Sequence, residues 1–289
     1  MSFKIKTAAA TSALAIGLAT APAAAQDVTI GWTAWSDAEA ITNMAAQIIE
    51  EHFDAEVEMT LADIAIQYQG VETGDLDMML MAWLPGTHAD YWENLSKDVI
   101  PVGPLYTGAR LGWVVPNYMD EATYGSIADL ASDEARDALN GEIQGIDPGA
   151  GLMRLSEEAL DVYGLDGYEV LTSSGAAMTA ALDRAIQNED PIVVTGWSPH
   201  WKFGAYDLRY LEDPEGALGG DERVHAMVRP GFDQDHPEIF GFLTRFTIDL
   251  DILQNLMAEA EETSYEEAVA NFIDENENLV NYWVTGTMS

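Results

Sequence analysis

The chain has 289 residues, with 50 Asp and Glu against 12 Lys and Arg, a formal net charge of −38 and no cysteine. This charge repels the phosphate backbone of a nucleic acid, which excludes nucleic-acid binding as a main function, and it disfavours an anionic membrane surface. The absence of cysteine excludes disulfide scaffolds, thiolate metal sites and cysteine nucleophiles. A hydrophobic content of 48% is too high for a disordered chain. The length suits one large domain or two lobes.

The first 25 residues have the pattern of a secretory signal peptide. Lys4 and Lys6 give a positive start, an apolar stretch follows over residues 8–19, and the alanines at 23–25 form a small-residue cleavage pattern before Gln26. The apolar stretch is too short to span a membrane, and no later segment approaches the roughly 18 uninterrupted apolar residues that a span needs. The sequence therefore predicts an exported, periplasmic protein.

The acidic residues are scattered at spacings typical of exposed helix surfaces. No Lys or Arg occurs between Lys6 and Lys97, and none follows Arg245. A solvated acidic coat is the favoured interpretation, and a cation-binding surface is the alternative. Because self-repulsion of this size is strongly screened above about 0.5 M salt, we expect a saline habitat.

Expected strands and helices alternate along the chain after residue 26. The apolar patterns predict strands over residues 28–32, 57–61, 76–82, 110–115, 143–146, 191–195 and 224–228. Helices are expected from Ser36 or Asp37 onward, over 68–73, 152–163 and 176–188, and through most of the chain after 237. This alternation predicts an α/β fold with mostly parallel sheets.

Three of the expected strands run directly into a segment that contains tryptophan, at Trp35, Trp83 and Trp197. Ligands of open α/β sheets bind beyond the carboxyl ends of the strands. A single such tryptophan is usually a packing residue, but three at equivalent positions predict an aromatic cage. Such a cage suits a quaternary ammonium ion, which has no N–H to donate. We expect Trp113 to pack within its strand rather than form a fourth wall.

A second motif, DPGAGLM at residues 147–153, lies between an expected strand and an expected helix. Its glycines allow a tight turn, and the free N–H groups of a helix N-terminus attract an anion. The motif lacks the Gly-Lys-Ser/Thr of a phosphate loop. Alone it predicts only a turn with a helix cap. Beside an aromatic cage it predicts a zwitterionic ligand, with the carboxylate on the amides of Gly151 and Leu152.

Several segments resemble the glycine-betaine-binding proteins of osmoprotectant ABC transporters, and the resemblance covers essentially the whole chain after the signal peptide. These segments are Trp35 and residues 82–88, 147–153, 173–182, 195–201 and 210–214. The resemblance implies a two-lobed periplasmic-binding-protein fold of type II, with a hinge between two α/β lobes and the ligand in the cleft. We expect residues 26–116 and 206–289 to form one lobe and residues 117–205 the other.

The resemblance also implies roles for individual residues. In the family, three indoles form a Trp prism, two backbone amides bind the carboxylate of the ligand, and a histidine touches the same carboxylate. The corresponding residues here are, in that order, Trp35, Trp83 and Trp197; Gly151 and Leu152; and His88.

One departure from the family pattern bears on the ligand. Trp35 is followed two residues later by Asp37, as in the related choline binders, where that Asp meets the hydroxyl group. The preferred interpretation of Asp37 is a helix N-cap, and that of His200 and Trp201 is support of the site from behind. The expected ligand is a methylated onium zwitterion, glycine betaine or dimethylsulfoniopropionate. Choline and trimethylamine N-oxide are the alternatives.

An enzyme is the competing class. The five histidines are dispersed without a His-x-x-x-His pair, and Ser198 near His200 is not part of a Gly-x-Ser-x-Gly elbow. We therefore expect no catalytic residues, no metal and no cofactor. The expected partner is the permease of an ABC transporter, which a monomeric binding protein supplies with ligand. A periplasmic sensor that presents its bound ligand to a receptor is a third possibility.

Overall fold

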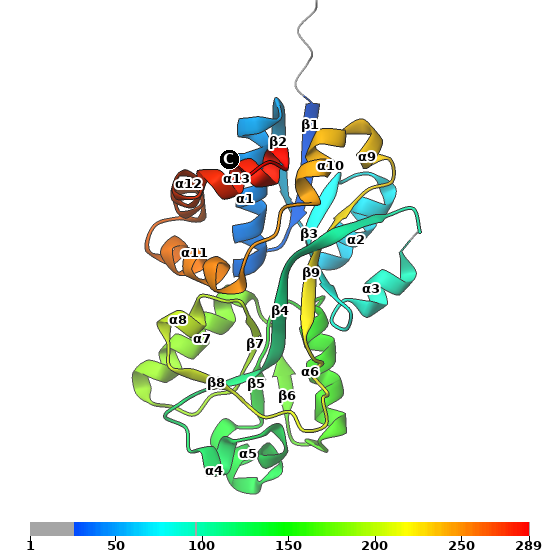
Figure 1. The fold of residues 1–289 in the computed structure, drawn as a ribbon. Coiled ribbons are helices and arrows are strands. Elements are labelled where there is room, and N and C mark those ends of the chain that lie inside the picture. Colours follow the sequence, from blue (N-terminus) through cyan, green and yellow to red (C-terminus); the bar gives the residue numbers. More distant parts are fainter. Residues whose placement is uncertain (1–25, 96, 289) are drawn as a thin grey trace, which may run out of the picture.

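The computed structural model describes residues 26–95 and 97–288, so the expected signal peptide lies outside the described residues. Within this part of the chain, no helix is both long and apolar enough to cross a membrane. The chain builds two lobes, one above the other in Figure 1, with β4 and β9 running between them. The first and last parts of the chain form one lobe, and the middle forms the other.

The described strands form one sheet in the order β2-β1-β3-β9-β4-β7-β5-β6, with β8 paired to β4. The strands are β1 (Gln26–Trp32), β2 (Ala55–Leu61), β3 (Met78–Leu84), β4 (Ile100–Pro116), β5 (Glu142–Gln144), β6 (Glu169–Leu171), β7 (Val194–Ser198), β8 (Leu208–Tyr210) and β9 (Glu222–Val228). Pairing is parallel between β1, β2 and β3 and between β5, β6 and β7, but every pair that includes β4 or β9 is antiparallel. The expectation of mostly parallel sheets is therefore wrong. The strand that leaves the first lobe and the strand that returns to it run in opposite directions.

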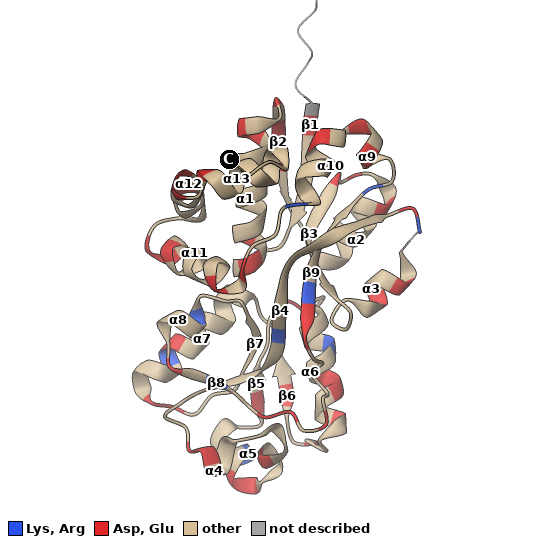
Figure 2. Ribbon diagram, viewed as in Figure 1, with Lys and Arg blue, Asp and Glu red and all other residues tan. Residues whose placement is uncertain are grey.

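Helices cover the sheet in both lobes (Figure 1). The first lobe has α1 (Ser36–His52), α2 (Ile64–Thr73), α3 (Ala89–Asn94), α9 (Phe232–Asp235), α10 (Pro237–Leu243), α11 (Leu250–Glu262), α12 (Tyr265–Glu275) and α13 (Glu277–Thr285). The second has α4 (Glu121–Tyr124), the 3-10 helix η1 (Ile127–Ala131), α5 (Asp133–Leu139), α6 (Gly151–Val162), α7 (Gly175–Asn188) and α8 (Lys202–Ala205). Asp and Glu lie along helices of both lobes, whereas Lys and Arg are few (Figure 2).

The core of the first lobe follows from two sequence patterns. In α1, apolar residues at helical spacing, among them Ile41, Met44 and Ile48, are fully buried. Strand β3 is an uninterrupted apolar run and is buried along nearly its whole length, as expected for a strand covered on both faces. This burial leaves the end of β3, with Trp83, facing the second lobe.

The expected strand 110–115 is only the second half of β4. The first half contains Pro101, Gly103, Pro104 and Gly108, residue types that normally interrupt a strand. Register shifts between β4 and β9 accommodate these residues, and Gly103 and Gly108 adopt the positive φ angles that glycine tolerates. The long strand thereby passes from one lobe into the other without a break.

The last comparisons with the sequence concern the strands of the second lobe and the boundaries of the two lobes. The expected strand 191–195 begins three residues later, as β7. Strand β8 pairs with the second half of β4, and Leu211 packs in the apolar cluster of the second lobe around Trp113. The division into residues 26–116 with 206–289 and residues 117–205 stays a prediction.

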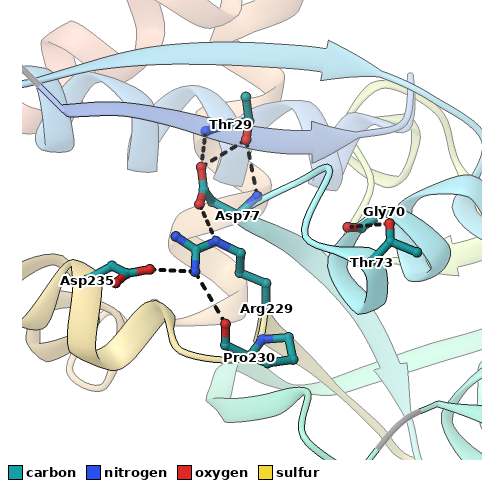
Figure 3. A network of polar contacts seen from close by, with 7 residues as sticks. All are labelled: Thr29, Gly70, Thr73, Asp77, Arg229, Pro230 and Asp235. Atoms are coloured by element: carbon teal, nitrogen blue, oxygen red, sulfur yellow. Dashed lines mark hydrogen bonds and ion pairs between the residues drawn. The ribbon is translucent and has the colours of Figure 1, made fainter.

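A polar network joins three strands of the first lobe at the end away from the second lobe (Figure 3). The carboxylate of Asp77, just before β3, accepts hydrogen bonds from the backbone N–H and the hydroxyl of Thr29 in β1, at 2.8 and 2.9 Å. It also pairs at 2.7 Å with Nε of Arg229, at the end of β9, and Nη1 of Arg229 reaches Asp235 at 2.7 Å. Burial alone raises the pKa of Asp77, but the hydrogen bonds from Thr29 and Arg229 outweigh it, and its pKa is lowered.

We expect Asp77→Asn to lower the free energy of unfolding by about 1–3 kcal/mol at pH 7, because it removes a charge-assisted interaction with a half-buried guanidinium. The folded-state pKa of Asp77 is lowered, so its contribution is present above the unfolded value near 4 and is lost as the pH falls through the folded value. Urea unfolding at pH 7 and pH 3 measures this. The difference from wild type should shrink at pH 3, and the exposed Asp75→Asn serves as the control.

Candidate ligand-binding site

A small cavity lies between the lobes, where the ends of three strands meet the start of α6. Residues from both lobes line it: Trp35, Trp83, Thr87, His88, Leu111, Ile146, Ala150, Gly151, Leu152 and Trp197. The structure thus brings together around one space the six residues that the sequence assigns to the ligand. Their contact with a ligand stays a prediction. Thr87, Leu111, Ile146 and Ala150 were not expected, because small and aliphatic residues carry no signal of their own.

The three tryptophans reach the cavity from different elements. Trp35 caps α1 just after β1, and its backbone N–H bonds to the carbonyl of Thr33 at 2.8 Å, which fixes the turn. Trp83 lies near the end of β3, and Trp197 lies in β7. The ring centroids of Trp35 and Trp197 are 6.4 Å apart at 58°, so the two indoles form adjoining walls across the cleft.

Each of these two indoles is held by a carboxylate of the other lobe. Nε1 of Trp35, from the first lobe, donates to Oδ2 of Asp147 in the second lobe at 3.0 Å. Nε1 of Trp197, from the second lobe, donates to Oδ1 of Asp37 in the first lobe at 2.9 Å. Because an indole N–H lies in the ring plane, these bonds fix the rings without covering a ring face.

Asp37 does not cap α1, and the expectation of an N-cap is wrong. Trp35 is the cap residue, and Asp37 is the second residue of the helix. Its fully buried carboxylate turns inward and accepts from the hydroxyl of Tyr106 at 2.7 Å as well as from Trp197. Burial raises the pKa of Asp37, and these two hydrogen bonds oppose the rise. Asp37 satisfies donors behind the indole and is not among the residues that line the cavity.

His88 lines the cavity and also anchors the end of β3. Its Nδ1 accepts a hydrogen bond from the backbone N–H of Trp83 at 3.1 Å, and the hydroxyl of Tyr68 lies 3.3 Å from the same nitrogen. Burial, with a smaller contribution from the charge of Arg154, lowers the pKa of His88 to about 3. A neutral ring with an accepting Nδ1 fixes the position of Trp83, whatever His88 does for a ligand.

The first two residues of α6, Gly151 and Leu152, line the cavity. The first N–H groups of a helix have no acceptor within it, so those of Gly151 and Leu152 are available to an anion. Gly151 also meets the other lobe, because a Cβ at this position would lie 2.2 Å from the carbonyl oxygen of Thr87. Only glycine permits this approach.

Glu222, at the start of β9, fixes the segment that carries Thr87, and sequence reasoning missed it. Its buried carboxylate accepts from the backbone N–H of Thr87 at 2.9 Å, from the hydroxyl of Thr87 at 3.1 Å and from the N–H of Gly86 at 3.1 Å. Glu222 and Thr87 are 135 positions apart in sequence, so no local pattern could have indicated this bond.

The remaining expected residues lie outside the cavity lining. Trp113 is fully buried in the second lobe and donates to the hydroxyl of Ser156 at 2.9 Å, so it packs in its strand. The ring of His200 packs edge-on against Trp197 with centroids 4.6 Å apart, and Trp201 packs against His200 at 5.5 Å. His200 and Trp201 thus lie behind the wall that Trp197 forms.

Residues 26–275 match the family model of the substrate binding domain of ABC-type glycine betaine transport systems. The chain belongs to this family. It is a family of substrate-binding proteins and not of enzymes. Further contacts join the lobes in this family member: the hydroxyl of Tyr91 donates to the carbonyl of Gly149 at 2.9 Å, and Arg154 pairs with Asp90 at 3.1 Å.

The chain is similar to three proteins whose names give glycine betaine, carnitine or choline as the bound compound. The glycine betaine/carnitine transport binding protein GbuC of Listeria monocytogenes is 37% identical over 159 residues, which are 54% of this chain and 53% of that protein, so the match spans about half of that relative. Lactococcal OpuAC, in a closed-liganded conformation complexed with glycine betaine, is 37% identical with a TM-score of 0.83, over 90% of this chain and all of that one. An ABC-transporter choline binding protein in complex with choline is 27% identical with a TM-score of 0.82, over 90% and 92% of the two chains.

We expect Gly151→Ala to block this closed arrangement without unfolding either lobe, because the added Cβ would collide with the backbone of Thr87 across the cleft. Solution scattering with saturating glycine betaine, the compound for which the family is named, should give a larger radius of gyration than wild type. Gly149→Ala is the matched control, since a Cβ there meets no atom within 4 Å. Equal radii for wild type and Gly151→Ala would contradict the steric argument.

Proposed function

We propose that the protein is an exported, periplasmic solute-binding protein that captures a methylated onium zwitterion in a Trp cage and delivers it to the permease of an ABC importer. Glycine betaine and dimethylsulfoniopropionate are the ligands that fit this description. The observation that carries the proposal is the meeting of Trp35, Trp83 and Trp197 with the amino end of α6 around one cavity.

The cage suits a cation that cannot donate a hydrogen bond. An onium group has methyl surface that packs against indole and a diffuse charge that the ring quadrupoles attract, worth about 2 kcal/mol or more at a desolvated face. A primary ammonium would lose its hydration without acceptors in return. The indole N–H groups of Trp35 and Trp197 are already paired with carboxylates, so the ligand meets ring faces.

The part of the cavity lined by α6 suits a carboxylate. Gly151 and Leu152 offer two N–H groups together with the positive end of the α6 dipole. The nearest histidine, His88, is neutral, because burial lowers its pKa to about 3. The carboxylate of the ligand is therefore held by backbone dipoles and not by a charged histidine. A ligand with one positive and one negative group, and no net charge, suits this cavity.

Ligand capture is coupled to closure of the lobes. Trp35 and Trp83 belong to the first lobe, whereas Trp197, Gly151 and Leu152 belong to the second. A ligand that touches both sets stabilises the closed state through this differential contact. The two strands that connect the lobes, β4 and β9, are the candidate hinge.

Choline is the alternative ligand, and the Trp-x-Asp spacing of Trp35 and Asp37 favours it. The similar choline-binding structure adds support. Against choline, the two oxygens of Asp37 already accept from Tyr106 and Trp197, which leaves the carboxylate occupied behind the cage. Trimethylamine N-oxide would likewise use the cage alone. A sensor role differs only in the partner, and neighbouring genes for a permease and an ATPase would distinguish the two.

We expect Trp83→Ala or Trp197→Ala to weaken glycine betaine binding at least about tenfold, because each change removes one desolvated indole face. Phe at either position should cost less, since a weaker quadrupole remains. Isothermal titration calorimetry measures both. Trp92→Ala, at the 37% exposed Trp92 of α3 outside the cavity, is the matched control. A wild-type affinity for both alanine variants would rule out the cage.

A competition series over glycine betaine, dimethylsulfoniopropionate, choline and glycine tests the two ends of the ligand. The methylated zwitterions should bind best, choline more weakly because it lacks the carboxylate, and glycine poorly or not at all. His88→Ala should weaken zwitterion binding more than choline binding if His88 assists at the carboxylate, and both equally if it acts by fixing Trp83. Choline binding more tightly than every zwitterion would move the assignment to a choline binder.

A further inference from the structure

Lys202 lies directly behind the cage wall formed by Trp197. Its side chain is fully buried, and its Nζ has no hydrogen-bond partner within the described part of the chain. Nζ lies 4.4 Å from the ring centroid of Trp197 and 5.4 Å from that of Phe203. Lys202 is not among the residues that line the cavity, so its amine contacts the indole from outside the cage. Buried amines without a partner are rare in proteins.

The surroundings of this amine bring its pKa close to neutral pH. Burial lowers the pKa of Lys202 to about 7, and the charge of Asp37, on α1, opposes the shift. The ring of His200, whose Nδ1 accepts from the backbone N–H of Lys202 at 3.1 Å, is neutral because burial and the charge of Lys202 hold its pKa well below the usual value. The hydroxyl of Tyr106 donates to Asp37, and burial raises the pKa of Tyr106 well above its usual value.

We propose that Lys202 is a specificity residue of the onium site, which disfavours ligands of net positive charge and releases its proton when such a ligand binds. The inference rests on the proposed function, because it requires an onium group on the cavity face of Trp197. The ammonium of Lys202 and the onium group would then face each other across a single indole ring.

Two physical effects oppose such an arrangement. A cation on one face of an indole draws the π electrons toward itself and weakens the attraction of the other face. The two cations also repel each other. At roughly twice the 4.4 Å between Nζ and the ring, and an effective dielectric constant of about 20, this repulsion corresponds to roughly a twentyfold loss of affinity when Lys202 is fully protonated.

A zwitterion loses less than a cation does. Its carboxylate is attracted by the same ammonium, which compensates part of the repulsion between the onium group and Lys202. Choline has no compensating charge. A protonated Lys202 therefore separates betaine-like ligands from choline-like ligands that fill the same cage, a distinction that the three indoles cannot make.

The sign of the pH dependence follows from linkage. Because a cationic ligand disfavours the charged amine, choline should bind tightly above the pKa of Lys202 and more weakly below it. Glu39 on α1 and Glu261 on α11 border the neighbouring space beside His200, and burial raises the pKa of both. These acids remain in a Lys202 variant, so a pH dependence of theirs would survive the substitution.

Calorimetry with choline and glycine betaine at pH 6.0 and pH 8.5 tests the proposal on wild type and Lys202→Met. Wild type should bind choline about tenfold more tightly at pH 8.5, with a smaller change for glycine betaine, and Lys202→Met should bind choline equally at both pH values. Lys97→Met is the matched control, because exposed Lys97 is the only other lysine after residue 25. Persistence of the wild-type pH dependence in Lys202→Met would overturn the proposal.

A measurement on unaltered protein guards against a variant that fails to fold. With two lysines after residue 25, NMR of ¹³Cε-labelled lysine gives two signals, and the one for Lys202 should titrate near neutral pH and move to a lower midpoint when choline binds. An unchanged midpoint at saturation would refute the inference and leave the proposed function intact. If neither compound binds wild type at either pH, the proposed function itself fails and the inference with it.

Discussion

The hydrogen bond between an indole N–H and a carboxylate of the opposite lobe is the interaction on which the cavity depends. It occurs twice in reciprocal form, from Trp35 to Asp147 and from Trp197 to Asp37. In an open molecule, each indole loses this acceptor and each wall can rotate. In the proposed function, the cage is therefore complete only when the lobes meet, and closure and cation affinity are one equilibrium. A carboxylate on the N–H also makes the ring more electron-rich, which strengthens its attraction for a cation.

This arrangement places a buried carboxylate next to the proposed cation site, and the groups around Asp37 reduce the free-energy cost of burying its charge. Two donors, Tyr106 and Trp197, compensate for the lost hydration of Asp37, and Lys202 lies within electrostatic reach without a direct ion pair. Buried charges of this kind contribute little to stability, but they can define which charges a neighbouring site accepts. In our proposal, Asp37 favours a positive ligand and Lys202 opposes it, so the two together set how strongly the ring of Trp197 attracts a cation.

Local patterns predicted the parts of this site that lie on single elements. Trp83 and Trp197 follow apolar strands, and the DPGAG motif precedes a helix start, so their positions at the ends of strands could be read from the sequence. The role of Asp37 could not, because a helix cap and an inward-facing residue of the first turn have the same sequence pattern. Its partner Trp197 is 160 positions away. Glu222 and the close approach of Thr87 to Gly151 were missed because their partners also lie far away in the sequence.

The predicted fold had a similar limit. Periodicity identified the longer helices and the buried strands of each lobe but not the short helices α3, α4, α5 and α8. The first half of β4 contains prolines and glycines that indicate a loop. Only pairing with β9, which comes more than 100 residues later, makes this segment a strand. Long-range pairing overrides local preference here because the chain must cross between lobes, and two antiparallel strands satisfy the backbone hydrogen bonds of that crossing.

The acidic surface of the protein cannot select a ligand that has no net charge. A net charge of −38 attracts every small cation near the protein, but salt screens this attraction beyond roughly 10 Å at 0.1 M and over still shorter distances in brine. A zwitterion gains almost nothing from such a field. We therefore expect discrimination to rest on groups in the cleft itself: indole faces that cannot replace the hydration of an inorganic ion, amides that attract an anion, and a buried amine behind one indole that disfavours excess positive charge.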